Sequence, residues 1–145
     1  MRTTRFTVGA VGAAAVCLLL SAEPVSAHHA FAAEFDATLP ITLEGTVAKV
    51  EWINPHSWIH VDVKNEDGAV DRWMIEGGNP TALLRRGFTK NSLPVGTEIV
   101  VEGYRAKGNP FRANGRDLTL ADGRTLFMGS SGTGAPSDGR DPTER

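Results

Sequence analysis

The four histidines of this chain fall in two short stretches, and imidazole is the commonest side chain that binds transition metals. His28 and His29 open the stretch HHAF, and His56 and His60 belong to NPHSWIH. Imidazole nitrogen suits copper, and Cu(II) lies near the top of the affinity order of divalent ions. A soft thioether such as that of Met74 also accepts Cu(I). The sequence therefore points to a metal site drawn from His28, His29, His56, His60 and Met74, with copper as the candidate ion.

The residues before His28 have the layout of a secretory signal peptide. A basic start is followed by an apolar run over residues 6–22 and by a short polar stretch that ends in Val-Ser-Ala. We predict that residues 1–27 are a cleaved signal, that the protein is periplasmic or secreted, and that the mature chain begins at His28. The apolar run is too short and too rich in Gly and Ala to span a membrane, so we expect no stable membrane insertion after cleavage.

A histidine at a new amino terminus has a metal chemistry that an internal histidine lacks. Its free amine, with a reference pKa of about 7.7 to 8.0, can lose its proton near neutral pH and bind a metal beside the imidazole of the same residue. A second imidazole from elsewhere in the chain would complete a T-shaped histidine brace for copper. His29 adds a further donor next to His28. The competing interpretation is that the two histidines form only a solvated chain end.

The pairing of two predicted strands decides what lies next to His60. On a strand, four residues span about 13 Å, so His56 and His60 are not expected to chelate one ion together. A hairpin turn centred on residues 66–68 pairs positions whose numbers add up to about 134, which places His60 beside Met74. A slip of one residue would separate this pair. The alternative interpretation treats His56 as a turn residue, and His60 and Met74 as surface residues.

The same register sorts the remaining side chains of the hairpin into a core face and an outer face. It places Ile59 opposite Ile75 and Val61 opposite Trp73 in the core, and Asp62 opposite Arg72 and Trp58 opposite Glu76 on the outside. An alternative site for a small molecule, a glycan or a periplasmic protein partner then lies on the outer face, formed by Trp58, Arg72, Glu76 and, from a later strand, Tyr104.

The elements that must position these side chains are mostly strands. Apolar and polar residues alternate most clearly over residues 56–64, and strands are also predicted over residues 43–53, 71–76, 97–106, 116–121 and 124–128. Asn79 and Pro80 are typical of a helix start and Gly87 of a helix end, so one short helix falls between the third and fourth strands. This order predicts an all-β fold, a small OB-fold-like β-barrel of five to six antiparallel strands.

Removal of the signal leaves 118 residues, enough for one small domain. We divide the chain into the signal peptide (1–27), a linker-like N-terminal arm (28–40), the OB-like β-barrel domain (41–128) and a disordered tail (129–145) rich in Gly, Ser, Pro and charge. Two arginines and one glutamate leave with the signal, so 13 basic side chains face 16 acidic ones, a net charge of −3. Because no basic field remains to neutralise phosphates, we expect no nucleic-acid partner.

Signatures of catalysis are missing from the sequence. Cys17, the only cysteine, leaves with the signal, and the chain has no Gly-x-Ser-x-Gly elbow, phosphate loop or HExxH motif. We therefore expect a binding module and not an enzyme.

Four motifs of the mature chain resemble those of a family of small, uncharacterised exported bacterial proteins. In that family, His-His-Ser/Ala-Phe follows the signal, and Val-x-x-Val-x-Trp-x-Asn-Pro-His, Trp-x-x-Glu and a Pro-x-x-Leu helix ending in Gly come next. The matching stretches are residues 28–31, 47–56, 73–76 and 80–87. The resemblance implies an exported domain of this family and assigns it no activity.

Overall fold

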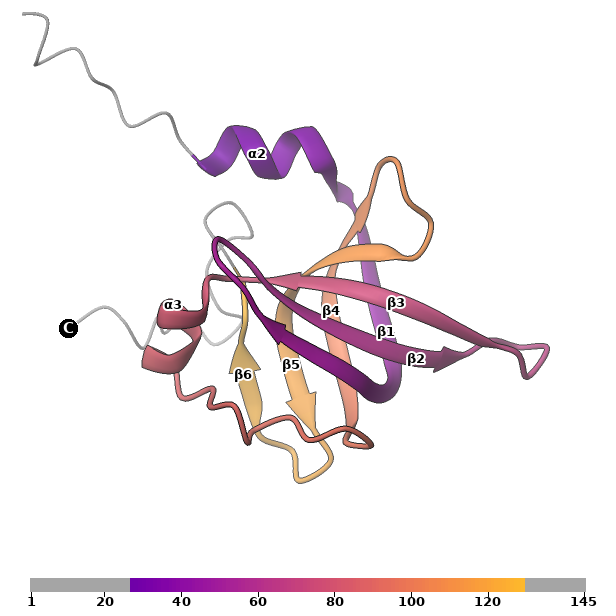
Figure 1. Cartoon of the computed structure of the whole chain (residues 1–145). Helices are drawn as coiled ribbons and strands as arrows, with labels where there is room; N and C mark the ends of the chain where they lie inside the picture. The colour runs from indigo at the N-terminus through magenta and orange to yellow at the C-terminus, as the bar shows by residue number, and fades with distance from the viewer. Residues whose placement is uncertain (1–26, 130–145) are drawn as a thin grey trace, which may run out of the picture.

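The computed structural model describes residues 27–129, so the predicted tail beyond Gly129 and the predicted signal peptide before Ala27 lie outside the described residues. Within residues 27–129, two helices and six strands follow one another along the chain (Figure 1). They are α2 (Ala27–Glu34), β1 (Phe35–Trp52), β2 (Ser57–Lys64), β3 (Val70–Gly77), α3 (Pro80–Arg85), β4 (Glu98–Ala106), β5 (Arg112–Leu120) and β6 (Thr125–Phe127).

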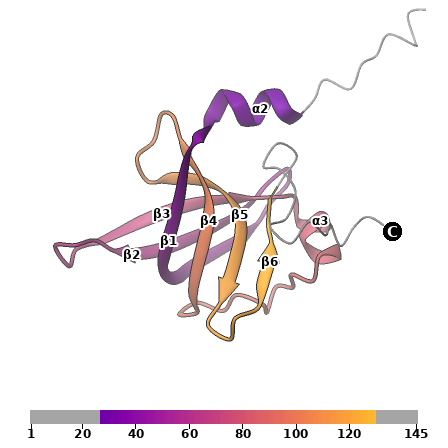
Figure 2. The same ribbon diagram turned by 180° about the vertical axis from the view of Figure 1, so that it is seen from behind.

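The strands form one sheet that closes on itself. Their order is β3-β2-β1-β4-β5-β6, and neighbours in this order are antiparallel. A parallel pairing between β3 and the first half of β5 closes strands β1 to β5 into a ring, and β6 pairs with the second half of β5. Seen from behind, β4, β5 and β6 form the side of the ring opposite the β2–β3 hairpin (Figure 2). A closed ring with one helix between β3 and β4 confirms the predicted all-β, OB-fold-like class.

The hairpin of β2 and β3 has the register that the sequence predicts. Ile59 pairs with Ile75, His60 with Met74, and Trp58 with Glu76. The turn between the strands is closed by a hydrogen bond from the Asn65 backbone N–H to the Ala69 carbonyl. Gly68 has a φ of 81°, a left-handed conformation that glycine adopts without strain. The turn chemistry therefore fixes the register, and with it the face of each side chain.

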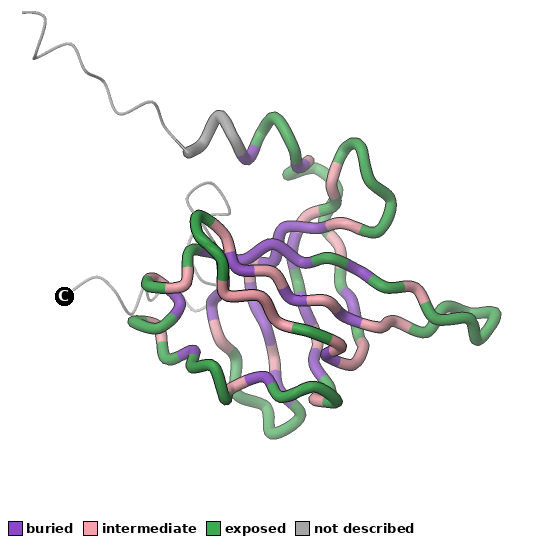
Figure 3. Tube along the Cα trace, in the orientation of Figure 1, coloured by how far each residue is buried: buried purple, intermediate pink, exposed green. Residues whose placement is uncertain are grey.

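Apolar side chains from every strand except β6 fill the interior of the ring, and buried positions alternate with more exposed ones along β2 and β4 (Figure 3). Side chains that follow β3 close the interior on one side, among them Leu83 of α3 and Phe88. The core consists of Leu43, Val47, Ile59, Val61, Trp73, Ile75, Leu83, Phe88, Leu93, Ile99, Val101, Ala113, Leu118, Leu120 and Met128.

Helix α3 begins and ends as predicted. The side chain of Asn79 caps the helix by accepting a hydrogen bond from the Ala82 backbone N–H at 2.8 Å, and Pro80 occupies the first helical turn. Gly87 has a φ of 95°, a left-handed conformation that glycine adopts without strain, so the helix ends and the chain changes direction there. Capping therefore stabilises this short helix, which follows directly after the end of β3.

The segment 28–40 is not the linker-like arm that we expected. Its first part belongs to α2, and its second part is the start of β1, which pairs with β4 through Phe35 and Pro40. Phe31 and Phe35 are buried, lie 5.6 Å apart between ring centroids, and hold the segment against the ring. Two aromatic side chains four residues apart can anchor a short helix by their burial, although its other residues are mostly small or polar.

Strand β1 contains a bulge that changes which of its side chains face the core. The bulge, between Val47 and Lys49, makes Ala48 an extra residue of this strand. Val47 is buried in its place, while Val50 and Trp52 pack partly buried against the core. One inserted residue reverses the alternation of faces, and a period-two pattern does not reveal it.

Candidate functional site

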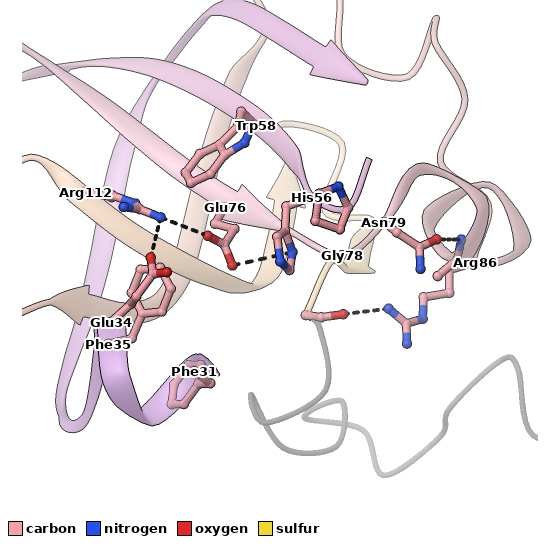
Figure 4. A pocket seen from close by; sticks show the side chains of 13 residues that line it. Phe31, Glu34, Phe35, His56, Trp58, Glu76, Gly78, Asn79, Arg86 and Arg112 are labelled. Carbon is pink, nitrogen blue, oxygen red and sulfur yellow. Dashed lines mark hydrogen bonds and ion pairs between the residues drawn. The ribbon is translucent and has the colours of Figure 1, made fainter. Parts of the chain in front are cut away.

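A pocket of about 410 Å³ opens at the end of the ring where β2 begins and β3 ends. One wall comes from α2 and the start of β1, and the facing wall comes from Asn79, α3 and the residue that follows it, Arg86 (Figure 4). His56, Trp58 and Glu76 lie between these walls, at the base of the pocket. A volume of this size is in the range of small-ligand sites in proteins.

Glu76 places a carboxylate at the base of the pocket, with a side chain only 8% exposed. Arg112 Nη2 donates to its Oε2 at 3.1 Å, and Asn114 Nδ2 donates to its Oε1 at 3.3 Å. We expected Glu76 on the outer face of the hairpin. It is buried because the parallel pairing sets Asn114 of β5 directly beside it, and the side chain of Arg112 covers it.

Arg112 connects the wall formed by α2 and the start of β1 to the base of the pocket. Its guanidinium lies 4.8 Å from the ring centroid of Trp58 and 5.4 Å from that of Phe35, so two aromatic faces sandwich the cation. Its Nη2 donates to Glu34 Oε2 at 2.6 Å as well as to Glu76. Its Nε is buried and has no hydrogen-bond partner among the described residues. Arg112 therefore ties α2 to the sheet and neutralises part of a two-carboxylate cluster.

His56 presents its ring to the same carboxylate. Its Nδ1 lies 3.5 Å from Glu76 Oε1, close enough for an ion pair when the ring is protonated but longer than a normal hydrogen bond. Nδ1 is buried without a hydrogen-bond partner among the described residues, while 36% of the side chain is exposed. Because Nδ1 is buried against Glu76, Nε2 is the ring nitrogen that is left for a ligand in the pocket.

The other internal histidine lies outside the pocket. His60 Nε2 is 2.7 Å from Glu51 Oε2, and the side chain of Met74 is its cross-strand neighbour, as the register predicts. Hydrogen bonds from Lys49 and His60 hold the pKa of Glu51 below its usual value. The structure thus pairs His60 with Met74 but does not bring either of them to His56.

The structure separates the four residues of the alternative ligand site that we predicted. Trp58 and Glu76 line the pocket, whereas Arg72 makes a two-pronged ion pair with Asp62 at 2.7 and 2.8 Å on another part of the hairpin. This pairing lowers the pKa of Asp62 and raises that of Arg72. Tyr104 packs its ring against Phe31, 5.7 Å away and edge to face, and supports the wall of the pocket instead of lining it.

Helix α2 includes the backbone of His28 and His29, but their side chains lie outside the described part of the structure. Among the side chains that the structure does describe, no three His, Cys, Asp or Glu residues are grouped so that they could hold a metal ion. Neither described helix is long and apolar enough to cross a membrane.

The fold and the pocket together define a small OB-fold-like domain with a polar cavity at one end of its ring. The chain belongs to the family of unknown function DUF6152, whose model matches residues 15–114. This match includes the pocket residues from Phe31 to Arg112. No curated protein matches the chain.

All four stretches that carry the family resemblance contribute to the pocket. The first, residues 28–31, supplies Phe31, and the second, residues 47–56, supplies His56. The third ends in Glu76, and the fourth forms α3 and supplies Arg86, whose Nη1 donates to the Gly129 carbonyl at 2.6 Å. The motifs are spread over residues 28–87, and the pocket is where they meet.

Proposed function

We propose that the protein is an exported metal-binding module that holds a transition-metal ion, copper, between an amino-terminal histidine and His56. The observation that carries this proposal is the position of His56, whose Nδ1 lies beside the buried carboxylate of Glu76. The module binds its ion and does not catalyse a reaction.

The arrangement of His56 and Glu76 resembles the second shell of many metal sites. A histidine that binds a metal through one nitrogen usually directs the other N–H to a carboxylate, which fixes the tautomer and orients the ring. Glu76 is well placed for this role because Arg112 and Asn114 hold its two oxygens. With Nδ1–H directed to Glu76, the lone pair of His56 Nε2 is available for the metal.

The remaining donors of the proposed site come from the amino terminus. Phe31 of α2 lines the pocket, and position 28 lies three residues earlier, which is about one helical turn. After cleavage behind Ala27, the amine and imidazole of His28 would add two nitrogens to that of His56, the three donors of a histidine brace. His29 is a further candidate donor. His60 is not included, because Glu51 already occupies its Nε2.

A second candidate function is the binding of a small organic molecule in the same pocket. The volume of about 410 Å³ favours it, because an ion and its ligand atoms fill only part of such a space. The aromatic side chains of Phe31, Phe35 and Trp58 provide apolar surface at this site. Trp58 and Glu76 of the predicted outer face line this pocket, whereas Arg72 is paired with Asp62 elsewhere on the hairpin, so the pocket replaces the outer face as the place for such a ligand.

The proposal is tested with protein purified after export. Its intact mass identifies the first residue, and a mature chain that does not begin at His28 would contradict the brace. Cu(II) titration is then compared with that of a protein carrying one methionine inserted between Ala27 and His28. The insertion removes the terminal chelate, so we expect copper affinity to fall at least about tenfold, and equal affinities would overturn the proposal.

Two histidine variants make the matched comparison on the barrel. His56→Asn should weaken copper binding at least about tenfold, and Glu76→Gln should weaken it about 10- to 100-fold by releasing the ring orientation. His60→Asn removes the same type of side chain outside the pocket and should leave the affinity unchanged. Equal losses in the His56 and His60 variants would contradict the assignment of His56.

A further inference from the structure

The pocket has more room and more hydrogen-bond donors than a metal ion needs. Two guanidinium groups, those of Arg86 and Arg112, face it from opposite walls (Figure 4). Asn79 uses its side-chain oxygen to cap α3, so its amide group retains two N–H donors on the same wall as Arg86. Guanidinium and amide N–H groups together recognise carboxylates.

Both carboxylates of the pocket already accept hydrogen bonds. Glu76 accepts from Arg112 and Asn114, and Glu34 accepts from Arg112 at 2.6 Å. A molecule that enters the pocket therefore meets the N–H groups of Asn79, Arg86 and Arg112, of which Arg86 Nη1 also donates to the Gly129 carbonyl. The buried Nε of Arg112, which has no partner among the described residues, points to a shortage of acceptors.

Glu34 shows where a carboxylate fits. Its side chain is 51% exposed and comes from the end of α2, yet its Oε2 makes the shortest contact of the Arg112 guanidinium. The aromatic rings of Phe35 and Trp58 fix this guanidinium from both sides, so its position does not depend on Glu34. An exposed glutamate on a fixed arginine occupies the place that the carboxylate of a ligand would take.

We propose that the pocket binds a small organic acid, whose carboxylate replaces Glu34 on Arg112 while the rest of the molecule extends toward Arg86. This inference rests on the proposed function of the pocket as a binding site, but not on the presence of copper. The ligand class is an acid with two acceptor groups, because cations lie on both walls. Release of Glu34 on binding also loosens one of the contacts that hold α2 to the ring.

Calorimetric titration of the metal-free exported protein with succinate tests this inference, with succinamide as an uncharged molecule of the same shape. We expect succinate to bind and succinamide not to bind. Glu34→Gln removes the competing charge at an exposed site and should tighten succinate binding about two- to fivefold, the range of a surface ion pair. Glu102→Gln makes the same change of charge on the exposed face of β4 and should have no effect.

Arg112→Lys keeps the charge but loses the planar fork, and it should weaken succinate binding at least about tenfold. If this variant does not fold, the succinate affinities of Glu34→Gln and Glu102→Gln test the inference without it. Succinamide binding as tight as that of succinate, no succinate binding at all, or equal affinities in the Glu34 and Glu102 variants would overturn the inference. Copper titration of the same samples separates the two proposals, since loss of one interaction leaves the other measurable.

Discussion

Removal of Arg112 provides a quantitative test of the base of the pocket. In Arg112→Met, Glu76 keeps its buried position but loses the guanidinium that donates to its Oε2, and it retains Asn114 at 3.3 Å. Breaking a buried ion pair from one side costs about 3–5 kcal/mol. The two lost cation–π contacts, with Trp58 and Phe35, add about 0.5–1 kcal/mol each. Because 28% of the Arg112 side chain is exposed, we expect the lower part of the summed range of about 4–7 kcal/mol, which is about 4–5 kcal/mol in total.

The double variant distinguishes two contributions to the loss of stability, the unpaired charge of Glu76 and the lost packing of Arg112. Arg112→Met combined with Glu76→Gln removes the buried charge that the first change leaves alone, so it should be about 2–3 kcal/mol more stable than the sum of the single effects predicts. Urea unfolding followed by circular dichroism gives the free energy of unfolding of all four proteins. Additive effects, or a loss below about 1 kcal/mol for Arg112→Met, would refute the view that this pair is a buried and coupled unit.

Three further predictions concern the frame around the pocket. Ile75→Ala empties a fully buried position of the core and should lower the free energy of unfolding by about 2–5 kcal/mol in urea, whereas a loss below 1 kcal/mol would contradict the closed ring. Asn79→Ala removes the cap of α3 and should cost about 1 kcal/mol by the same assay; no loss would contradict the capping hydrogen bond. The folded-state pKa of Glu51 is lowered, first by Lys49 and then by His60, so its contribution to stability is complete above its unfolded pKa and is lost as pH falls through the folded one. Glu51→Gln should therefore flatten the acid side of the stability curve measured by thermal unfolding, and an unchanged acid side would contradict this ion pair.

Local patterns in the sequence were sufficient for much of the frame. The alternation over β2 and the turn around Gly68 gave the register of the hairpin residue by residue, because a short turn fixes which positions face each other. Asn79, Pro80 and Gly87 likewise marked the bounds of α3. Each of these features depends on residues that are near one another in the chain.

The polar base of the pocket could not be found in this way. Arg112 and Asn114 precede the strand predicted over residues 116–121, and nothing nearby in the sequence indicates that they extend β5. They reach Glu76 through the parallel pairing that closes the ring. Arg112 is 36 positions and Asn114 is 38 positions away from Glu76 in the sequence. The anchoring of α2 by Phe31 and Phe35 is non-local as well, since it depends on Tyr104 and Arg112. A pattern of periodicity along one strand contains no information about such contacts.

The electron paramagnetic resonance spectrum of the exported protein with one equivalent of Cu(II) tests the central claim most directly. If His56 is a ligand, the spectrum should show nitrogen coupling that changes in His56→Asn and is preserved in His60→Asn, since His60 lies on Glu51 outside the pocket. A spectrum that is the same in the parent protein and in His56→Asn would show that copper binds elsewhere, and it would contradict the proposed site.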